Sequence, residues 1–495
     1  MSLLPIIPEI SLLLASFIIL IFEAFCGKRI KYSKRISFII AIIFSVFSLF
    51  VLINYYNNPI ISKGGYLFNS SLSFNQYLFL IKISLLSLLI FFIFSISHFI
   101  EETKYGAEFL ALTLLSVVGS LFLISSNHLL SFYISLELQT FPLYIMAAFY
   151  RNSEQASESA LKYFILSAVA SGLLLFGISL IYGFSGAINF DVLIDRTTFR
   201  SGVSIMILLG FILVITTMLF KIAAAPFHIW SPDVYQGAPT AATSFFATIA
   251  KFASAIAIIE IFRFLAITWK NIDQIFILTA ILSLVIGALG AIKQNNIKRL
   301  LAYSSVGHIG FILSSLAIFH PLYSFAGLTI YIIIYSFASI GVFSFLLSLH
   351  NSSKGQIDDV NNNKYDINSL AGIAKSNPIL ASALTILIFS FAGIPPMSGF
   401  FSKFYVLFSI VRSEHYILAL VAIISAVISC FYYLRIVKIM YFDKKPENST
   451  ISVIRCNANI ILIISAVIAI AAPLYFSPLM NLVEGNIIHI FRNGG

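Results

Sequence analysis

Ionisable residues inside long apolar runs are the features of this sequence that could do chemistry. Five lysines interrupt stretches dominated by Ile, Leu, Phe and Ala: Lys82, Lys162, Lys221, Lys251 and Lys403. A charge in such a run costs at least a few kcal/mol when it is buried in lipid without a partner or water. These lysines therefore indicate either a path for protons or ions, or ion pairs that fix helix packing.

Glu137 adds an acidic group near the middle of the apolar run 128–149. An unpaired carboxylate there would take up a proton, whereas a cationic partner would hold it ionised. Lys221 is the natural partner, because we expect it at a comparable depth in the same group of helices. Such a pair can load and release a proton as its spacing changes, and a static interhelical ion pair is the alternative interpretation.

Two of the lysines lie close to prolines within otherwise apolar runs. Lys221 shortly precedes Pro226, and Lys403 shortly follows Pro395 and Pro396. Proline removes a backbone donor and breaks a helix, so each place can offer free backbone dipoles and room for water within the membrane. A simple kink is the alternative for a lone proline. The neighbouring lysines favour two broken helices on a transport path.

Other residues could extend these two places. Lys251 is expected near the bilayer middle, and His308, beside two serines, could relay protons at neutral pH or simply pack against its neighbours. Glu158 and Lys162 are four residues apart on one helix face, which fits a local ion pair at the inner membrane edge or a proton entrance. These residues complete the predicted site.

Two charged residues are given no part in it. Lys82 is close enough to the start of its helix to extend its ammonium group to the membrane surface, so no function is expected of it. Asp233 lies in a polar segment on the inner side, where a turn or capping role is expected.

The composition requires a lipid environment. Hydrophobic residues make up 59% of the 495 positions and charged residues only 10%, which leaves too little polar surface for a soluble protein. The repeated apolar runs predict an all-α polytopic membrane protein with about 14 transmembrane helices. The first run, from Leu3 to Phe25, has no basic region before it and no cleavage site after it, so it is expected to be a retained helix.

The basic residues indicate orientation. The net charge is +10, but these residues are scattered through short loops, which argues against nucleic-acid binding. If the loop 27–37 is placed inside, most of the loop lysines and arginines fall on that side, and both termini lie outside. We expect a multi-pass protein of the bacterial inner membrane or, alternatively, of the mitochondrial inner membrane.

The helices divide into four parts. Residues 1–107 hold three peripheral helices, residues 108–267 and 268–441 hold five helices each, and residues 442–495 hold an inner loop, the last helix and the outer C-terminus. Each five-helix part contains one of the predicted breaks with its lysine. This shared feature suggests an internal repeat.

The sequence contains no pattern for a bound redox group or nucleotide. Cys26, Cys430 and Cys456 are too scattered to ligate an iron–sulfur cluster. The glycines form neither a G-x-G-x-x-G nor a Walker pattern. No cofactor and no metal are expected in this chain.

Five segments carry a family resemblance: Leu136–Gln139, Leu161–Phe164, Pro226–Thr240, Asn296–His308 and Gly393–Tyr405. They resemble the antiporter-like membrane subunits of respiratory complex I, NADH:quinone oxidoreductase, and within that family subunit N, whose mitochondrial counterpart is subunit 2. The resemblance covers essentially the whole chain and is most specific between Glu108 and Tyr433. Two features favour subunit N over its relatives: lysine at position 403, where subunit M has glutamate, and the sequence of the segment Pro232–Pro239.

The resemblance implies two inverted five-helix repeats, each with a discontinuous helix, and a lateral proton route through Glu137, Lys221, Lys251 and Lys403. It also implies that the whole complex, but not this chain, holds FMN, iron–sulfur clusters, NADH and quinone. Neighbouring membrane-arm subunits are the expected partners, together with the lipid bilayer. A subunit of a secondary cation/proton antiporter and a purely structural scaffold are the alternatives.

Overall fold

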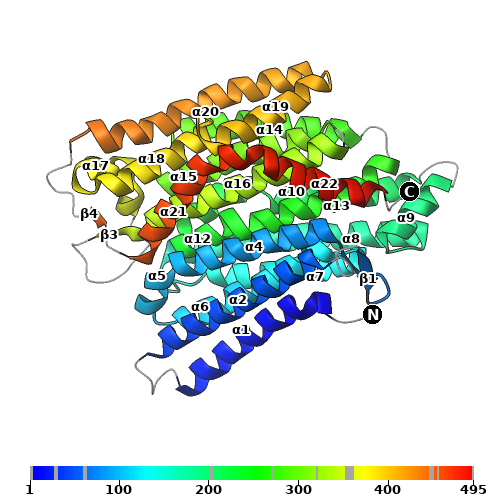
Figure 1. The fold of residues 1–495 in the computed structure, drawn as a ribbon, viewed down its shortest axis with the longest axis horizontal. Coiled ribbons are helices and arrows are strands. Elements are labelled where there is room, and N and C mark those ends of the chain that lie inside the picture. Colours follow the sequence, from blue (N-terminus) through cyan, green and yellow to red (C-terminus); the bar gives the residue numbers. More distant parts are fainter. Residues whose placement is uncertain are drawn as a thin grey trace.

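The fold was analysed in a computed structural model that describes residues 4–26, 32–58, 64–199, 204–268, 272–318, 321–351, 362–444, 451–453 and 456–492. Long helices run side by side along the longest axis of the molecule (Figure 1). Both termini lie at one end of the helices, and α17, β3 and β4 lie at the opposite end. Residues 27–31 of the basic loop that orients the sequence fall outside the described residues.

The four predicted parts, a division that stays a prediction, contain four groups of consecutive elements. The first group is η1 (Leu4–Ile6), α1 (Ile7–Cys26), α2 (Ser33–Asn57), β1 (Gly65–Leu67), β2 (Leu72–Phe74), α4 (Gln76–Ser95) and α5 (Ser97–Glu102). The second is α6 (Gly106–Ser125), α7 (Leu129–Ala147), α8 (Glu154–Ser185), α9 (Phe190–Phe199), α10 (Ile205–Lys221), α11 (Trp230–Gly237), α12 (Thr240–Phe245), the π-helix η2 (Phe246–Ala250) and α13 (Lys251–Thr268). The third is α14 (Ile272–Ile292), α15 (Ile297–Leu316), α16 (Pro321–Ser348), β3 (Leu349–Asn351), η3 (Asn362–Tyr365), η4 (Ile367–Leu370), α17 (Ile373–Ser376), α18 (Pro378–Ala392), α19 (Ser398–Arg412) and α20 (Tyr416–Phe442). The last is β4 (Ile451–Val453), α21 (Asn457–Ala471), η5 (Ala472–Tyr475) and α22 (Phe476–Arg492).

Polar residues in the loops set where several helices begin. The side chain of Asn75 accepts a hydrogen bond from the Leu78 amide at the start of α4, and Asn296 accepts from the Lys298 and Arg299 amides at the start of α15. These contacts satisfy amides that have no partner within the helix. Gly186, in the left-handed conformation, ends α8.

The helical membrane architecture predicted from composition is confirmed. Within the described residues, 11 helices are long and apolar enough to cross a membrane, and Ile205–Lys221 and Pro378–Ala392 are shorter apolar helices. Both short helices end at the predicted breaks, where α10 stops at Lys221 and α18 stops at Ala392. The total of about 14 spans and the inverted repeat stay predictions.

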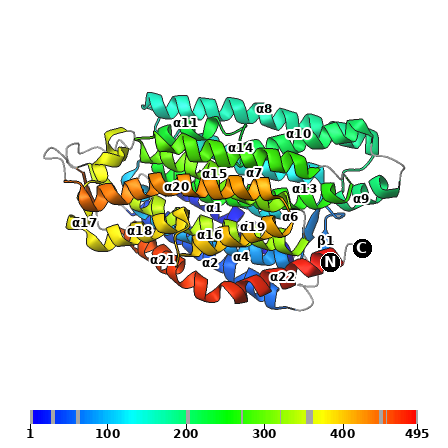
Figure 2. The ribbon, with the colours of Figure 1, turned by 90° about the horizontal axis from the view of Figure 1, so that it is seen from above.

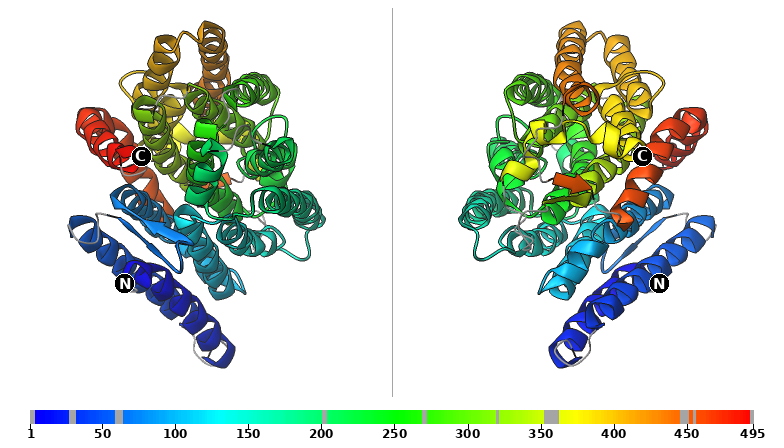
Figure 3. Two further views of the ribbon diagram at one scale, coloured as in Figure 1. Left: turned by 90° about the vertical axis from the view of Figure 1, so that its right-hand side faces the viewer. Right: turned by 90° about the vertical axis from the view of Figure 1, so that its left-hand side faces the viewer.

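The helix pairs that carry the site pack closely. α6 lies along α7, α8 along α10, and α14 along α15. Seen from above, α8 and α10 form one long edge of the molecule (Figure 2). Seen end-on, α1 and α2 lie at the bottom, where they pack against α6 and α4, while α19 and α20 lie at the top (Figure 3). The central helices are thus enclosed by neighbours on several sides.

Two small antiparallel β-ladders were not predicted. β1 pairs with β2, with Gly65 opposite Phe74. β3 pairs with β4, with Leu349 opposite Val453. The second ladder ties the end of α16 to the segment before α21, which are far apart in the sequence.

Candidate proton-transfer site

Glu137 and Lys221 both make hydrogen bonds to α8. The Lys221 ammonium nitrogen, at the end of α10, donates to Ser167 Oγ over 2.6 Å. Ser171, one helical turn further along α8, donates to Glu137 Oε1 on α7. Among the described residues no ion pair joins Glu137 to Lys221 directly. The expected direct pair is therefore replaced by two serines of an intervening helix.

Ser167 has a third partner that the sequence did not reveal. The Tyr144 hydroxyl, on α7, donates to Ser167 Oγ over 2.7 Å. Ser167 is fully buried, and Lys221 and Tyr144 are buried beside it. Serines in membrane helices commonly bond to a carbonyl of their own helix, so residue type alone gave no signal for this role.

Lys251 begins α13 directly after the π-helix η2. Its ammonium nitrogen donates to Ser305 Oγ on α15 over 2.8 Å and lies 5.6 Å from the centre of the Tyr235 ring. A π-helical turn widens the hydrogen-bond spacing and is frequent at functional positions. Gln139 on α7 donates to the Ala250 carbonyl in this turn over 3.0 Å. Because Gln139 is two residues from Glu137, the two side chains point to opposite faces of α7, which therefore lies between Glu137 and the helix of Lys251.

His308 on α15 is held between tyrosines. Its Nδ1 is 2.8 Å from the Tyr331 hydroxyl and its Nε2 is 3.1 Å from the Tyr433 hydroxyl. Tyr433 is also hydrogen-bonded to Ser304. The direction of each histidine bond depends on the tautomer. A ring with hydroxyl partners on both nitrogens can take up a proton on one side while it releases one on the other.

Lys403 is held by main-chain acceptors. Its ammonium nitrogen donates to the carbonyls of Phe391 over 2.7 Å and Ala392 over 3.1 Å. These are the last residues of α18, where carbonyls lack partners within the helix. Gly393 follows in the left-handed conformation, with φ +82°, and a Cβ there would lie 2.9 Å from Lys403 Cδ. The break therefore both frees the acceptors and makes room for the lysine.

A narrow cavity adjoins both His308 and Lys403, and Ser304, Ser429 and Tyr432 also line it. It has room for about one water molecule. His308 and Lys403 thus line the same polar cavity, although no direct hydrogen bond joins them.

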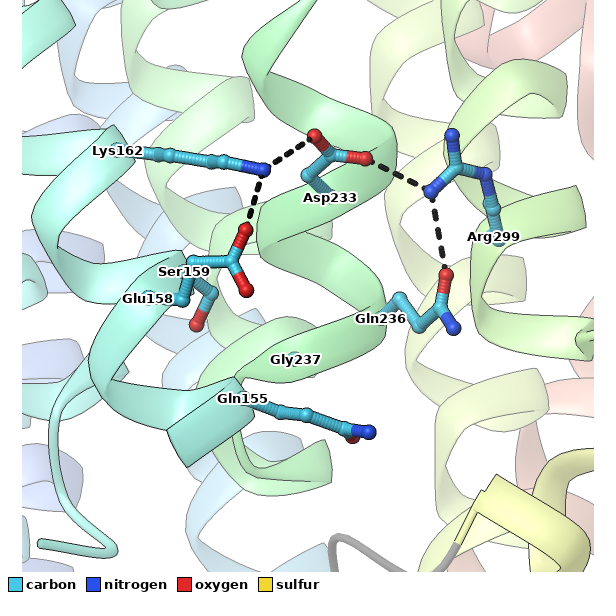
Figure 4. Close-up of a pocket in the computed structure, with 8 residues that line it drawn as sticks. All are labelled: Gln155, Glu158, Ser159, Lys162, Asp233, Gln236, Gly237 and Arg299. Carbon is cyan, nitrogen blue, oxygen red and sulfur yellow. Dashed lines mark hydrogen bonds and ion pairs between the residues drawn. The ribbon is translucent and has the colours of Figure 1, made fainter. Parts of the chain in front are cut away.

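Charges of alternating sign line a pocket at the ends of α8, α11 and α15 (Figure 4). Lys162 pairs with Glu158 over 2.7 Å and with Asp233 over 3.1 Å. Arg299 pairs with the other oxygen of Asp233 over 2.7 Å and donates to Gln236 over 3.2 Å. The pair of Glu158 with Lys162 is thus part of a larger network. Within the described part of the chain, no hydrogen bond or ion pair joins this network to Glu137.

The structure corrects the role predicted for Asp233. Its carboxylate binds the side chains of Lys162 and Arg299 and not a turn amide. Burial alone would raise the pKa of Asp233, but the hydrogen bonds and charges of Lys162 and Arg299 outweigh it and lower that pKa below its usual value. The residues around Asp233 in the sequence could not show this, because Lys162 and Arg299 are 71 and 66 residues away.

Lys82 also differs from its prediction. Instead of extending to the membrane surface, it is buried and pairs with Glu9 of α1 over 2.5 Å. A partner of opposite sign offsets part of the cost of burying a charge. The sequence did not reveal this pair because Glu9 and Lys82 are 73 residues apart and lie on different helices, α1 and α4.

The described residues include no group of three or more His, Cys, Asp or Glu side chains arranged to hold a metal ion. The site described above consists of ammonium, carboxylate, hydroxyl and imidazole groups. Groups of these kinds can take up and release protons.

Comparison with known proteins places the chain in a family. Residues 126–429 match the family model described as "NADH:quinone oxidoreductase/Mrp antiporter, TM". NADH-quinone oxidoreductase subunit N of Pelagibacter ubique is 41% identical over 410 residues, covering 79% of this chain and 81% of that protein. The subunit N of Bartonella bacilliformis is 38% identical over 455 residues, covering 90% and 89%. NADH-ubiquinone oxidoreductase chain 2 of Marchantia polymorpha is 40% identical, covering 70% of each.

Solved structures share the fold. A chain of respiratory complex I from Thermus thermophilus superposes with a TM-score of 0.78 at 24% identity, over 96% of this chain and 98% of that one. A chain of the Mrp complex from Dietzia superposes with a TM-score of 0.82 at 17% identity, over 99% and 98%. The chain belongs to the NADH:quinone oxidoreductase/Mrp antiporter family of membrane subunits and falls among its subunit N members.

Proposed function

We propose that this chain is a proton-translocating membrane-arm subunit of NADH:quinone oxidoreductase, and that protons move through Glu137, Lys221, Lys251, His308 and Lys403. The observation that carries the route is that Lys221, Lys251 and Lys403 are buried and donate hydrogen bonds to uncharged oxygens. A lysine held by a carboxylate is fixed in its charged form, whereas one held by neutral oxygens can lose its proton more readily.

The order of the contacts supports a lateral path. α8 contacts both Glu137 and Lys221, α7 lies between Glu137 and the turn that precedes Lys251, and α15 carries both Ser305, the partner of Lys251, and His308. The cavity beside His308 reaches Lys403. Each half of the path belongs to one of the predicted units 108–267 and 268–441.

Glu158 and Lys162 are the proposed entrance on the inner side. They line an open polar pocket with Asp233 and Arg299 (Figure 4). Charged groups of both signs keep water and exchangeable protons near the membrane edge. The outward exit is assigned to the region of Lys403.

The energy must come from partners of the chain. Each proton moved outward works against about 2.3 kcal/mol per 100 mV. Electron transfer is expected in other subunits, where NADH, FMN, iron–sulfur clusters and quinone would supply the redox chemistry. A change in charge passed along the neighbouring membrane-arm subunits would then alter the protonation of Glu137 and Lys221. The setting is the bacterial inner membrane, in keeping with the bacterial relatives.

The test is NADH-driven proton pumping in membrane vesicles that carry Lys251→Met, with assembly checked on a native gel. Lys293→Met is the matched control, because Lys293 is exposed in the loop after α14. We expect Lys251→Met to lower pumping at least about tenfold and the control to leave it unchanged. Normal pumping in assembled Lys251→Met complex would instead support a structural scaffold. Proton movement driven by an imposed sodium gradient without NADH would support a cation/proton antiporter.

A further inference from the structure

Ser167 differs from other serines of its own helix. Ser159 and Ser185 donate to carbonyls of α8 itself, those of Ala156 and Ile181. Ser167 instead receives hydrogen bonds from side chains on two other helices, Lys221 of α10 and Tyr144 of α7. Its hydroxyl group therefore joins three helices at a fully buried point.

A hydroxyl group at this point can serve both protonation states of the lysine. It accepts from an ammonium group through a lone pair, and it can donate its own hydrogen to a neutral amine. Tyr144 can follow this change in the role of Ser167, because the Tyr144 hydroxyl group can either donate to Ser167 or accept from it as the hydroxyl hydrogens rotate. In either state the Lys221 nitrogen keeps Ser167 as a hydrogen-bond partner, and leaving a buried polar atom without any partner would cost about 1–3 kcal/mol.

A second serine of α8, Ser171, contacts the carboxylate of Glu137. Ser171 lies one turn from Ser167 on the same face of α8 and donates to Glu137. The titratable groups around Ser167 are Lys221 on α10, Glu137 and Tyr144 on α7, and the buried Tyr163, one turn earlier on α8, whose ring centre lies 5.1 Å from that of Tyr144. A shift of α8 that follows the charge of Glu137 would move Ser167 relative to Lys221. The charge of Glu137 can thus reach Lys221 through a helix, without direct contact.

We propose that Ser167 is a positioning residue for proton transfer at Lys221, which it holds in both the charged and the neutral form. This inference rests on the proposed function, because it assigns Ser167 a part in the same proton route. It identifies α8 as the element that couples Glu137 to Lys221.

The experiment compares three serine variants in the assembled complex. Ser167→Ala removes the hydroxyl group, Ser167→Thr retains it, and Ser179→Ala removes the same atom from an exposed position on α8. NADH-driven pumping and turnover are measured from pH 6 to pH 9, with Lys221→Ala in parallel. The range is chosen to include the decline of activity on the alkaline side.

We expect Ser167→Ala to lower pumping about fivefold to tenfold and to move the alkaline decline to lower pH, because the charged lysine loses its acceptor. Ser167→Thr should recover activity to within about twofold, and Ser179→Ala should match the wild type. If Lys221→Ala abolishes pumping while Ser167→Ala leaves rate and pH profile unchanged, the role of Ser167 is wrong and the proposed function stands. If neither variant changes pumping, the proposed function itself fails. If Ser167→Ala and Ser167→Thr lose pumping equally and the pH profile does not shift, Ser167 serves only in helix packing and the proposal is wrong.

Discussion

Lys221 and Lys403 lie beside the two helix breaks but are held by different kinds of oxygen. Lys221 donates to the Ser167 hydroxyl group, which can also donate in return. Lys403 donates to the Phe391 and Ala392 carbonyls, which can only accept. The Ser167 hydroxyl group can therefore donate to a neutral lysine at the first site, whereas the two carbonyls at the second site cannot. The difference suggests that proton exchange is controlled at Lys221, where one partner can serve both protonation states of the lysine.

The largest effect that tests this contrast is expected from Lys403. Lys403→Met leaves the two carbonyls without their donor and removes the charge, so coupled turnover should fall at least about tenfold. Lys403→Arg retains a charge for the carbonyls and should recover part of the rate. NADH oxidation and proton pumping in assembled complex are the measurements. Full activity of Lys403→Met would show that the second break has no part in proton transfer.

A smaller loss is expected from Glu137→Gln. Glutamine still accepts from Ser171 but carries no charge, so pumping should fall about fivefold. Glu154→Gln is the control, because Glu154 is exposed at the start of α8. Equal activity of Glu137→Gln and Glu154→Gln would show that the carboxylate of Glu137 has no part in proton transfer at the first site.

Gly393→Ala tests how the second site is shaped. The added methyl group meets Lys403 and the positive φ strains the backbone by about 1–2 kcal/mol, so we expect about a threefold loss of pumping. Gly183→Ala is the matched control, since nothing lies within 4 Å of a Cβ at that position of α8. Unchanged pumping in Gly393→Ala would mean that the position of Lys403 tolerates displacement.

The smallest effect is expected from Asp233→Asn at the entrance pocket. Ion pairs of partly exposed groups contribute about 1 kcal/mol or less, so pumping should fall no more than about twofold. Because the pKa of Asp233 is lowered, its pairs are fully present above the usual aspartate pKa and are lost only as the pH falls through the lowered value. The loss should therefore be constant between pH 6 and pH 8. A tenfold loss would move control of the route from Lys221 to the entrance.

Much of the fold could be predicted from the sequence, because lipid permits few ways to satisfy the backbone. The breaks after Lys221 and before Ser398 were predicted from proline and lysine, and both are confirmed. The partners of the lysines could not be predicted. Ser167, Ser305 and the carbonyls of α18 become partners only when distant helices pack, and serine carries no distinctive pattern in an apolar run. The pair of Lys82 with Glu9 was missed for the same reason.

The most direct test of the central claim is the number of protons pumped per NADH oxidised in membranes that carry Lys221→Ala, with assembly checked on a native gel. The account predicts an assembled complex in which both the proton yield and coupled turnover fall at least about tenfold. If both remain unchanged, Lys221 is a structural charge and the proposed control of proton exchange at the first site is wrong.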